Sequence, residues 1–181
     1  YTSELKKVLT FISKDLIDDY PTKKITTEYF ILSLLNVKQC LAYKVLNRIM
    51  HKENLDTMYD FFARYVHDNA QQIQQKNDKL VGYDALLSKH ITTNASIEKD
   101  ALNDPKISSE HVFLSILNTG GTIKSQIESF GVTYKQYLEE INNIRLEEIK
   151  KNESDRALSK SISGFEPTKN GKRSGIESYC V

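Results

Sequence analysis

The chain contains nearly the same phrase twice, ITTEYFILSLLN at residues 25–36 and ISSEHVFLSILN at residues 107–118. Both copies read Ile, two small hydroxyl residues, Glu and a ring side chain, followed by an apolar run that one Ser interrupts and Asn closes. The copies start 82 residues apart, and a proline precedes each of them, at positions 21 and 105. Because order as well as residue type is kept, we interpret this repeated phrase as the signature of a structural unit that is used twice.

The composition is typical of a globular protein with a core of its own, since 39% of the 181 residues are apolar and 27% are charged. The net charge is +1 and the charges are mixed, so no basic stripe indicates a nucleic-acid partner. No apolar run approaches the ~18 residues of a membrane span, and no signal peptide opens the chain. Cys40 and Cys180 form no CxxC pair, which favours a reducing compartment. We therefore expect a cytoplasmic protein without a membrane partner.

Helix is the predicted state of most of the chain, because glycine is absent before Gly82 and proline occurs only at positions 21, 105 and 167. Apolar residues at helical spacing predict a first helix at 3–18. The first copy of the phrase begins a second helix, which is apolar nearly all round and should therefore be buried, with Thr26 or Thr27 as its N-cap. A third helix carries Leu41, Val45, Leu46 and Ile49. A fourth follows Asn54, with a predicted inner face of Leu55, Met58, Phe61, Phe62, Tyr65 and Val66.

The pattern restarts after a polar spacer at 67–79. The second copy of the phrase again begins a helix, Gly131 is a predicted C-cap, and Thr133 and Gln136 form a capping box for a last helix. Before the phrase, a helical segment carries Leu86, Leu87, Ile91, Ile97 and Leu102, and the last helix carries Leu138, Ile141 and Ile144. The sequence thus predicts an all-α tandem repeat of two four-helix units, 1–75 and 82–151.

The composition shifts after residue 151 to Ser, Gly and Lys without apolar spacing, which predicts a flexible linker at 152–181. Within it, GFEPTKNGKRS (164–174) is the nearest match to a phosphate-binding loop. Six residues instead of four separate its glycines, and Arg173 stands where Ser or Thr must follow the Lys. We therefore expect that this chain alone neither binds nor hydrolyses ATP.

No other pattern predicts catalysis, a metal or a cofactor. The four histidines, His51, His67, His90 and His111, show no HExxH spacing and are expected at the surface or at helix ends. The polar opening of the phrase has two interpretations. It is either a helix cap with a favourably placed acid, or a site where free amides accept an anion beside a carboxylate that accepts a cation.

The phrase resembles one that marks the N-terminal domain of Clp-type AAA+ unfoldases, I-G-T-E-H-L-L-L-G-L-L, with Thr26 and Ser108 in place of the usual Gly. GTIKSQIESFGVT (121–133) resembles the end of the second unit in that family, and GIESYCV (175–181) resembles the stretch before the first ATPase module. The resemblance covers nearly the whole chain. It implies a double-repeat helical N-domain at 1–151 and a linker at 152–181 that leads to an absent ATPase module.

By this resemblance the chain is a non-catalytic domain that docks protein substrates and adaptor proteins onto a homohexameric ATP-driven chaperone, in some members with a protease partner. In ClpC-like members each repeat also binds phosphoarginine through the Thr-Glu start of the phrase, which points here to Thr27 and Glu28 and to Ser109 and Glu110. An alternative of the same fold is the N-domain of the ATPase that dismantles contractile secretion sheaths and binds a sheath-protein helix.

Overall fold

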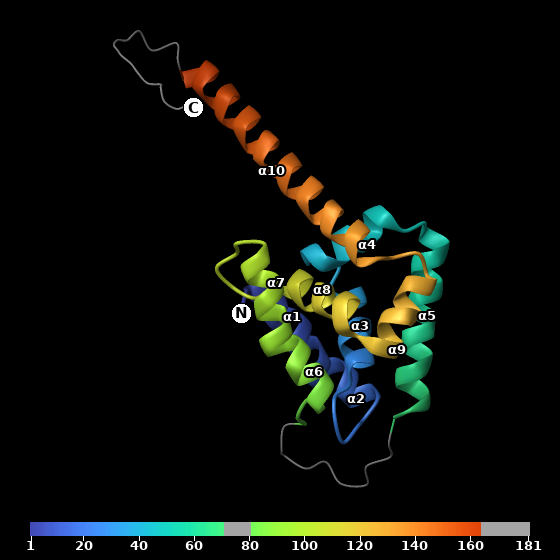
Figure 1. Ribbon diagram of the computed structural model, residues 1–181. Coiled ribbons are helices and arrows are strands. Elements are labelled where there is room, and N and C mark those ends of the chain that lie inside the picture. Colours follow the sequence, from blue (N-terminus) through green and yellow to red (C-terminus); the bar gives the residue numbers. More distant parts are fainter. Residues whose placement is uncertain (71–80, 164–181) are drawn as a thin grey trace. The chain divides into compact units, whose positions relative to one another are not determined.

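The computed structural model describes residues 1–70 and 81–163 of the chain. Helices joined by loops make up these residues, and an isolated bridge between Ile25 and Tyr83 is the one β-type pairing among them (Figure 1). The chain divides into a compact unit, Tyr1–Ile141, and a second unit that begins at Asn142. The predicted all-α fold is therefore confirmed for the described residues.

The first repeat opens with one continuous helical stretch, formed by α1 (Ser3–Phe11), the π turn η1 (Ile12–Leu16) and α2 (Ile17–Asp19). The phrase then forms α3 (Thr27–Asn36), which is followed by α4 (Leu41–Ile49) and α5 (Lys52–Asp68). Thr2 caps α1 by accepting a hydrogen bond from the Leu5 amide at 3.2 Å.

The second repeat copies this plan. Its first stretch consists of α6 (Ala85–Lys89), the π turn η2 (His90–Asn94) and α7 (Ala95–Ala101), and α8 (Ser109–Thr119), α9 (Gly121–Ser129) and α10 (Tyr134–Ser163) follow. The first stretch, the phrase helix and the last helix begin at positions 3, 27 and 52 in repeat one and at 85, 109 and 134 in repeat two, a constant offset of 82. The predicted tandem repeat is confirmed.

The two repeats are joined by a reciprocal pair of backbone hydrogen bonds, which we call the clasp. The Thr2 amide donates to the Ile107 carbonyl at 2.9 Å, and the Asp84 amide donates to the Ile25 carbonyl at 2.8 Å. Thr2 and Asp84 hold equivalent positions in front of the first helices, and Ile25 and Ile107 each open a copy of the phrase. Each repeat therefore anchors the phrase of the other.

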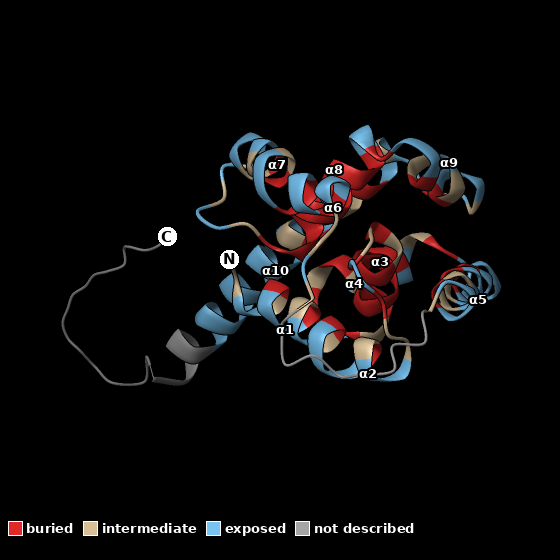
Figure 2. Ribbon diagram, turned by 90° about the horizontal axis from the view of Figure 1, so that it is seen from below, coloured by how far each residue is buried: buried red, intermediate tan, exposed pale blue. Residues whose placement is uncertain are grey.

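The phrase helices α3 and α8 lie in the core, and nearly every residue along them is buried (Figure 2). The Ser that interrupts each apolar run has a structural reason. Ser33 donates its hydroxyl to the Val8 carbonyl at 2.6 Å, and Ser115 lies against the carbonyl of His90 at 3.4 Å, the equivalent residue of repeat two. Each hydroxyl thereby bonds the first helical stretch of its own repeat within an otherwise apolar contact.

Tyr137 ties the last helix of repeat two to repeat one. Its side chain is fully buried, stacks on Phe113 with ring centroids 4.7 Å apart, and donates its hydroxyl to the Ala42 carbonyl at 3.0 Å. The capping box that starts this helix is present as predicted, since the amides and side chains of Thr133 and Gln136 bond reciprocally at 3.1 and 3.2 Å. Gly131 has a φ of +94°, which fits its predicted place at the end of α9.

Three large apolar residues that were predicted to face the core are exposed: Phe61 by 37%, Leu86 by 47% and Ile97 by 60%. Phe61 instead makes edge-on ring contacts with Phe62 and Phe130, at the side of α5. In repeat two the π turn coincides with a buried stripe that differs from the predicted one. The buried residues of this stripe are Leu87, His90, Ile91, Ala95 and Glu98.

The observed helix ends differ from the expected ones at two places. The fourth helix of repeat one starts at Lys52, before Asn54, and α10 continues to Ser163, past the expected linker boundary at residue 151. Long polar helices can form wherever helix-favouring residues such as Glu, Lys, Arg and Leu recur, even without a buried face. Most of the spacer and the segment 164–181, with its failed phosphate-loop match, lie outside the described residues.

Replacing Tyr137 by Phe should lower the free energy of unfolding by about 1–3 kcal/mol, because the buried Ala42 carbonyl loses its donor while the ring stacking is kept. Urea unfolding of the purified chain measures this loss. Tyr43→Phe is the matched control, because the Tyr43 hydroxyl makes no hydrogen bond within the described part of the chain. Equal stability of the two variants would contradict the role of Tyr137 at the repeat junction.

Candidate functional site

The opening of α3 presents the first predicted pair, Thr27 and Glu28. Thr27 is 1% exposed, and its hydroxyl oxygen has no hydrogen-bond partner among the described residues. Thr26 holds the N-cap position in extended backbone, but its side chain makes no capping bond, so the predicted cap is present in backbone geometry only. The first amides of any helix have no acceptor inside the helix, so this opening is able to receive an anion.

Glu28 is half-buried at this opening. Burial raises the pKa of the nearby Tyr65 phenol, and the charge of Glu28 and a hydrogen bond to it raise that pKa further, followed by the charge of Asp84. The Glu28 carboxylate therefore lies beside Tyr65 and reaches the surface. Lys24, directly before the phrase, is exposed and is the nearest cation to Gly82. The opening thus combines a carboxylate with a ring hydroxyl.

The opening of α8 is closed by comparison. Ser109 is fully buried and Glu110 is only 4% exposed. The Ser108 amide donates to His111 Nδ1 at 2.8 Å, and the Thr2 hydroxyl donates to the Ser108 hydroxyl at 2.8 Å. The Ser108 amide and hydroxyl at this helix start are therefore bonded within the protein itself.

Elements of repeat one cover the Glu110 side chain. Burial raises the pKa of the Cys40 thiol, and the charges of Glu4 and Glu110 raise it further, while Ser109 opposes the shift through a hydrogen bond. Burial also raises the pKa of Tyr137, to which the charge of Glu110 adds. Glu110 therefore lies in a buried polar cluster with Cys40 and Tyr137.

The four predicted site residues thus form two separate pairs at equivalent helix starts. Thr27 is buried and Glu28 is half-buried at the start of α3, whereas both Ser109 and Glu110 are buried at the start of α8, which packs against repeat one. The Glu28 side chain is half-buried beside Tyr65, whereas Glu110 is 4% exposed.

His90 contradicts the expectation that the histidines lie at the surface or at helix ends. It is fully buried within the first helical stretch of repeat two, its Nδ1 lies 3.0 Å from the Ser115 hydroxyl, and its Nε2 has no partner within the described residues. His111 is also buried, but at the start of α8, where its Nε2 lies 2.7 Å from Asp104. These placements depend on the packing of α8 and carry no signal in local sequence.

Glu98 is a second buried polar residue that the sequence did not indicate. The Tyr134 hydroxyl donates a short hydrogen bond to its Oε1, and the Asn118 amide donates to its Oε2 at 3.4 Å. Burial, with the hydrogen bond to Glu98 and its charge, raises the pKa of Tyr134 to about 12. This network links α7, α8 and the start of α10, and its role is structural.

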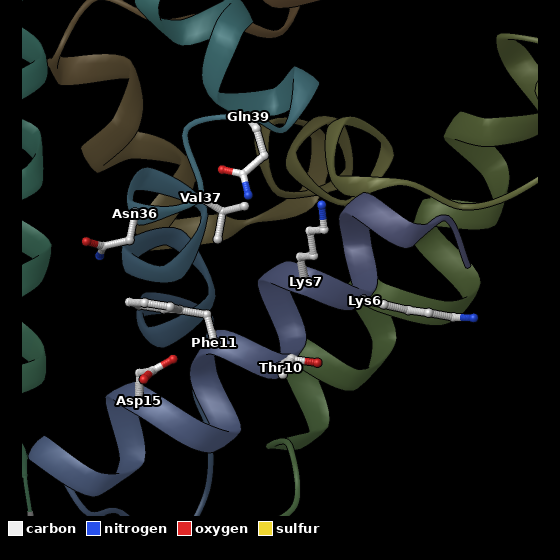
Figure 3. Close-up of a pocket in the computed structure, with 8 residues that line it drawn as sticks. All are labelled: Lys6, Lys7, Thr10, Phe11, Asp15, Asn36, Val37 and Gln39. Carbon is white, nitrogen blue, oxygen red and sulfur yellow. The ribbon is translucent and has the colours of Figure 1, made fainter.

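A pocket of about 370 Å³ opens on repeat one between the first helical stretch and the turn from α3 to α4 (Figure 3). Its lining residues are Lys6, Lys7, Thr10, Phe11, Asp15, Asn36, Val37 and Gln39. It is separate from the predicted pairs, which lie at the opposite, N-terminal ends of α3 and α8. Within the described residues, no three His, Cys, Asp or Glu side chains are grouped to hold a metal, and no helix is long and apolar enough to cross a membrane.

The sequence matches no family model and no curated protein. The fold, however, matches the N-terminal domain of Hsp104 from Candida albicans with a TM-score of 0.63 and 12% identity, over 80% of this chain and 91% of that one. It also matches the N-domain of ClpV from Vibrio cholerae with a TM-score of 0.61 and 17% identity, over 78% of this chain and 82% of that one. This chain has the Clp N-domain fold. The resemblance of the repeated phrase is thereby confirmed at the level of structure.

The buried His90 of this Clp N-domain fold should make stability sensitive to acid. Burial lowers the pKa of His90 below its ordinary 6.5, against a smaller opposing effect of Asp84. Below pH 6.5 the unfolded chain therefore takes up a proton that the folded chain refuses. This contribution to stability is complete above pH 6.5 and is lost as the pH falls toward the folded pKa, with a slope of up to about 1.4 kcal/mol per pH unit.

The variant His90→Val installs the residue that repeat one carries at the equivalent position, Val8, and should flatten this slope between pH 5 and 6.5. Urea unfolding across that pH range provides the measurement. His67→Gln is the control, because His67 is exposed and its replacement should leave the slope unchanged. An unaltered slope in His90→Val would assign the acid sensitivity to other groups.

Proposed function

We propose that this chain is the non-catalytic docking domain of a Clp-type AAA+ unfoldase, to which it recruits protein substrates or adaptor proteins. The observation that carries the proposal is the Clp N-domain fold, matched over 78–80% of the chain by two proteins of that class. The assembly expected for the full protein, a cytoplasmic homohexamer that works with or without a protease partner, belongs to the same proposal.

Within this function we propose Thr27 and Glu28 as a phosphoarginine site. The amides at the start of α3 supply donors for the phosphate. The unpartnered Thr27 hydroxyl is buried, so it adds a donor once the helix start opens toward the ligand. The half-buried Glu28 carboxylate supplies the acceptor for the guanidinium. Lys24, three residues before Thr27, is an exposed cation in the segment that leads to this helix start.

Ser109 and Glu110 remain the proposed second site, with a lower apparent affinity for phosphoarginine than the first site. Their burial means that a ligand has to displace the contacts between the repeats before it reaches the carboxylate. The apparent affinity of a site is lowered in proportion to the fraction of molecules in which that site is open. We therefore expect repeat one to account for most of the binding.

A second candidate is the N-domain of an ATPase that disassembles contractile secretion sheaths. The match to the ClpV N-domain, at a TM-score of 0.61, is close to that of the Hsp104 domain and supports this alternative equally. Under this alternative the ligand is a helix of a sheath protein, and no phosphoarginine is required.

Replacing Glu28 by Gln should weaken the binding of a phosphoarginine peptide by about ten- to hundredfold, because a charge-assisted pair worth roughly 1.5–3 kcal/mol is lost. Isothermal titration of the full chain with the peptide measures the effect. Glu110→Gln is the matched variant and should change the affinity far less, since Glu110 is buried. The same peptide with unmodified arginine controls for attraction of the guanidinium alone.

Three results would contradict this reading. Absence of phosphoarginine binding would leave the glutamates as structural residues, and equal losses in the two variants would show that both repeats bind. Binding of a helical peptide from a sheath protein, without binding of phosphoarginine, would favour the second candidate.

A further inference from the structure

The pocket on repeat one combines an apolar floor with cationic and amide groups at its rim. Val37 is buried and Phe11 is half-buried, and both contribute carbon surface to the floor. Lys7 extends its ammonium group toward the same mouth of the pocket as the Gln39 amide, while Asn36 lies beyond the ring of Phe11 (Figure 3). Such a mixture of apolar surface and a few polar groups is typical of binding pockets.

The charge at the rim is available to a ligand. Lys7 is exposed and makes no ion pair within the described residues. Lys6 is likewise without an ion pair there, but its ammonium group points away from the pocket (Figure 3). Asp15 lies at the opposite end from Gln39, so the positive charge is concentrated at the Lys7 end.

The second repeat provides an internal control for what the fold itself requires. At the equivalent positions it carries Ser88, Lys89, Thr92, Thr93, Ile97, Asn118, Thr119 and Gly121. Phe11 is thus replaced by Thr93, Val37 by Thr119 and Gln39 by Gly121, although the helices are the same. The apolar floor and the amide rim are therefore not needed to build the repeat.

We propose that this pocket docks a short acidic segment of a partner protein, with an apolar side chain against Phe11 and Val37 and a neighbouring carboxylate on Lys7. Charge selects the occupant, because the free ammonium group is complementary to a carboxylate, which also accepts hydrogen bonds from the Gln39 amide. The volume of about 370 Å³ suits one side chain with its adjoining backbone. The site goes beyond the proposed phosphoarginine site and shares no residue with it.

The test uses the full chain and the synthetic peptide acetyl-Glu-Glu-Leu-Leu-Glu-Glu-amide, followed by two-dimensional ¹H–¹⁵N NMR. The side-chain amide signals of Asn36 and Gln39 report directly on the pocket, since both groups line it. We expect saturable shifts of these signals. A peptide with Gly-Gly in place of Leu-Leu should bind about tenfold more weakly, because it lacks the apolar anchor, and one with Lys in place of Glu should not bind.

Four variants locate the binding. Lys7→Glu should weaken it by at least about tenfold. Lys6→Glu makes the same change of charge one residue away and should cost less than about threefold, because the Lys6 ammonium points elsewhere. Phe11→Thr, which copies repeat two, should weaken binding about tenfold with little loss of fold, and Lys89→Glu in repeat two should have no effect.

Shifts confined to other residues, or no saturable shift, would overturn the proposal. Equal losses in Lys6→Glu and Lys7→Glu would also overturn it, by showing diffuse attraction without a pocket. Displacement of the peptide by heparin, with the same shifts of Asn36 and Gln39, would identify a general polyanion site instead. The variant Glu28→Gln should leave this binding intact, which separates failure here from failure of the phosphoarginine site.

Discussion

The burial of two helices that are apolar on nearly every side is the constraint on which this structure depends. One four-helix unit cannot surround such a helix completely, so each phrase helix needs contacts from the other repeat. α8 packs against α1 and α4 of repeat one, and α3 packs against α6 of repeat two. The clasp fixes this exchange, because each repeat uses the amide directly before its first helix to bond the start of the other repeat's phrase. The hydroxyls of Ser33 and Ser115 are tolerated in this core since both find backbone acceptors.

The same exchange makes two nearly identical motifs chemically unequal. At the start of α8, Cys40 and Tyr137 lie close enough to the buried Glu110 to feel its charge, whereas Glu28 at the start of α3 lies beside Tyr65 and is half-buried. Residues outside the phrase contribute to the difference, and within the phrase His111 bonds the Ser108 amide at a position where repeat one carries Tyr29. A duplicated fold thereby supplies one accessible carboxylate and one that belongs to the junction between its halves.

The features that the sequence predicted are local or periodic. Helix positions follow from apolar spacing, and the repeat follows from the offset of 82 residues. Both can therefore be predicted without knowledge of the packing. The burial of His90, Glu98 and Glu110 is set by the element that lies across from each residue, and polar residue types argue against burial when they are considered alone. The pocket was not predictable, because its floor joins Phe11 to Val37 from separate helices and no sequence pattern connects them.

The clasp also has a consequence for synthesis on the ribosome. The Thr2 amide cannot form its bond until Ile107 has been synthesised. In the same way, the Ala42 carbonyl lacks its donor until Tyr137, 95 residues further along the chain, has been added. Closing loops of that length costs entropy before any contact is gained, so such pairings form late in folding. While the second half is still being made, the first half has an incomplete core and exposes the apolar surface of α3. The nascent chain is then itself an aggregation-prone polypeptide, the kind of molecule that needs a chaperone.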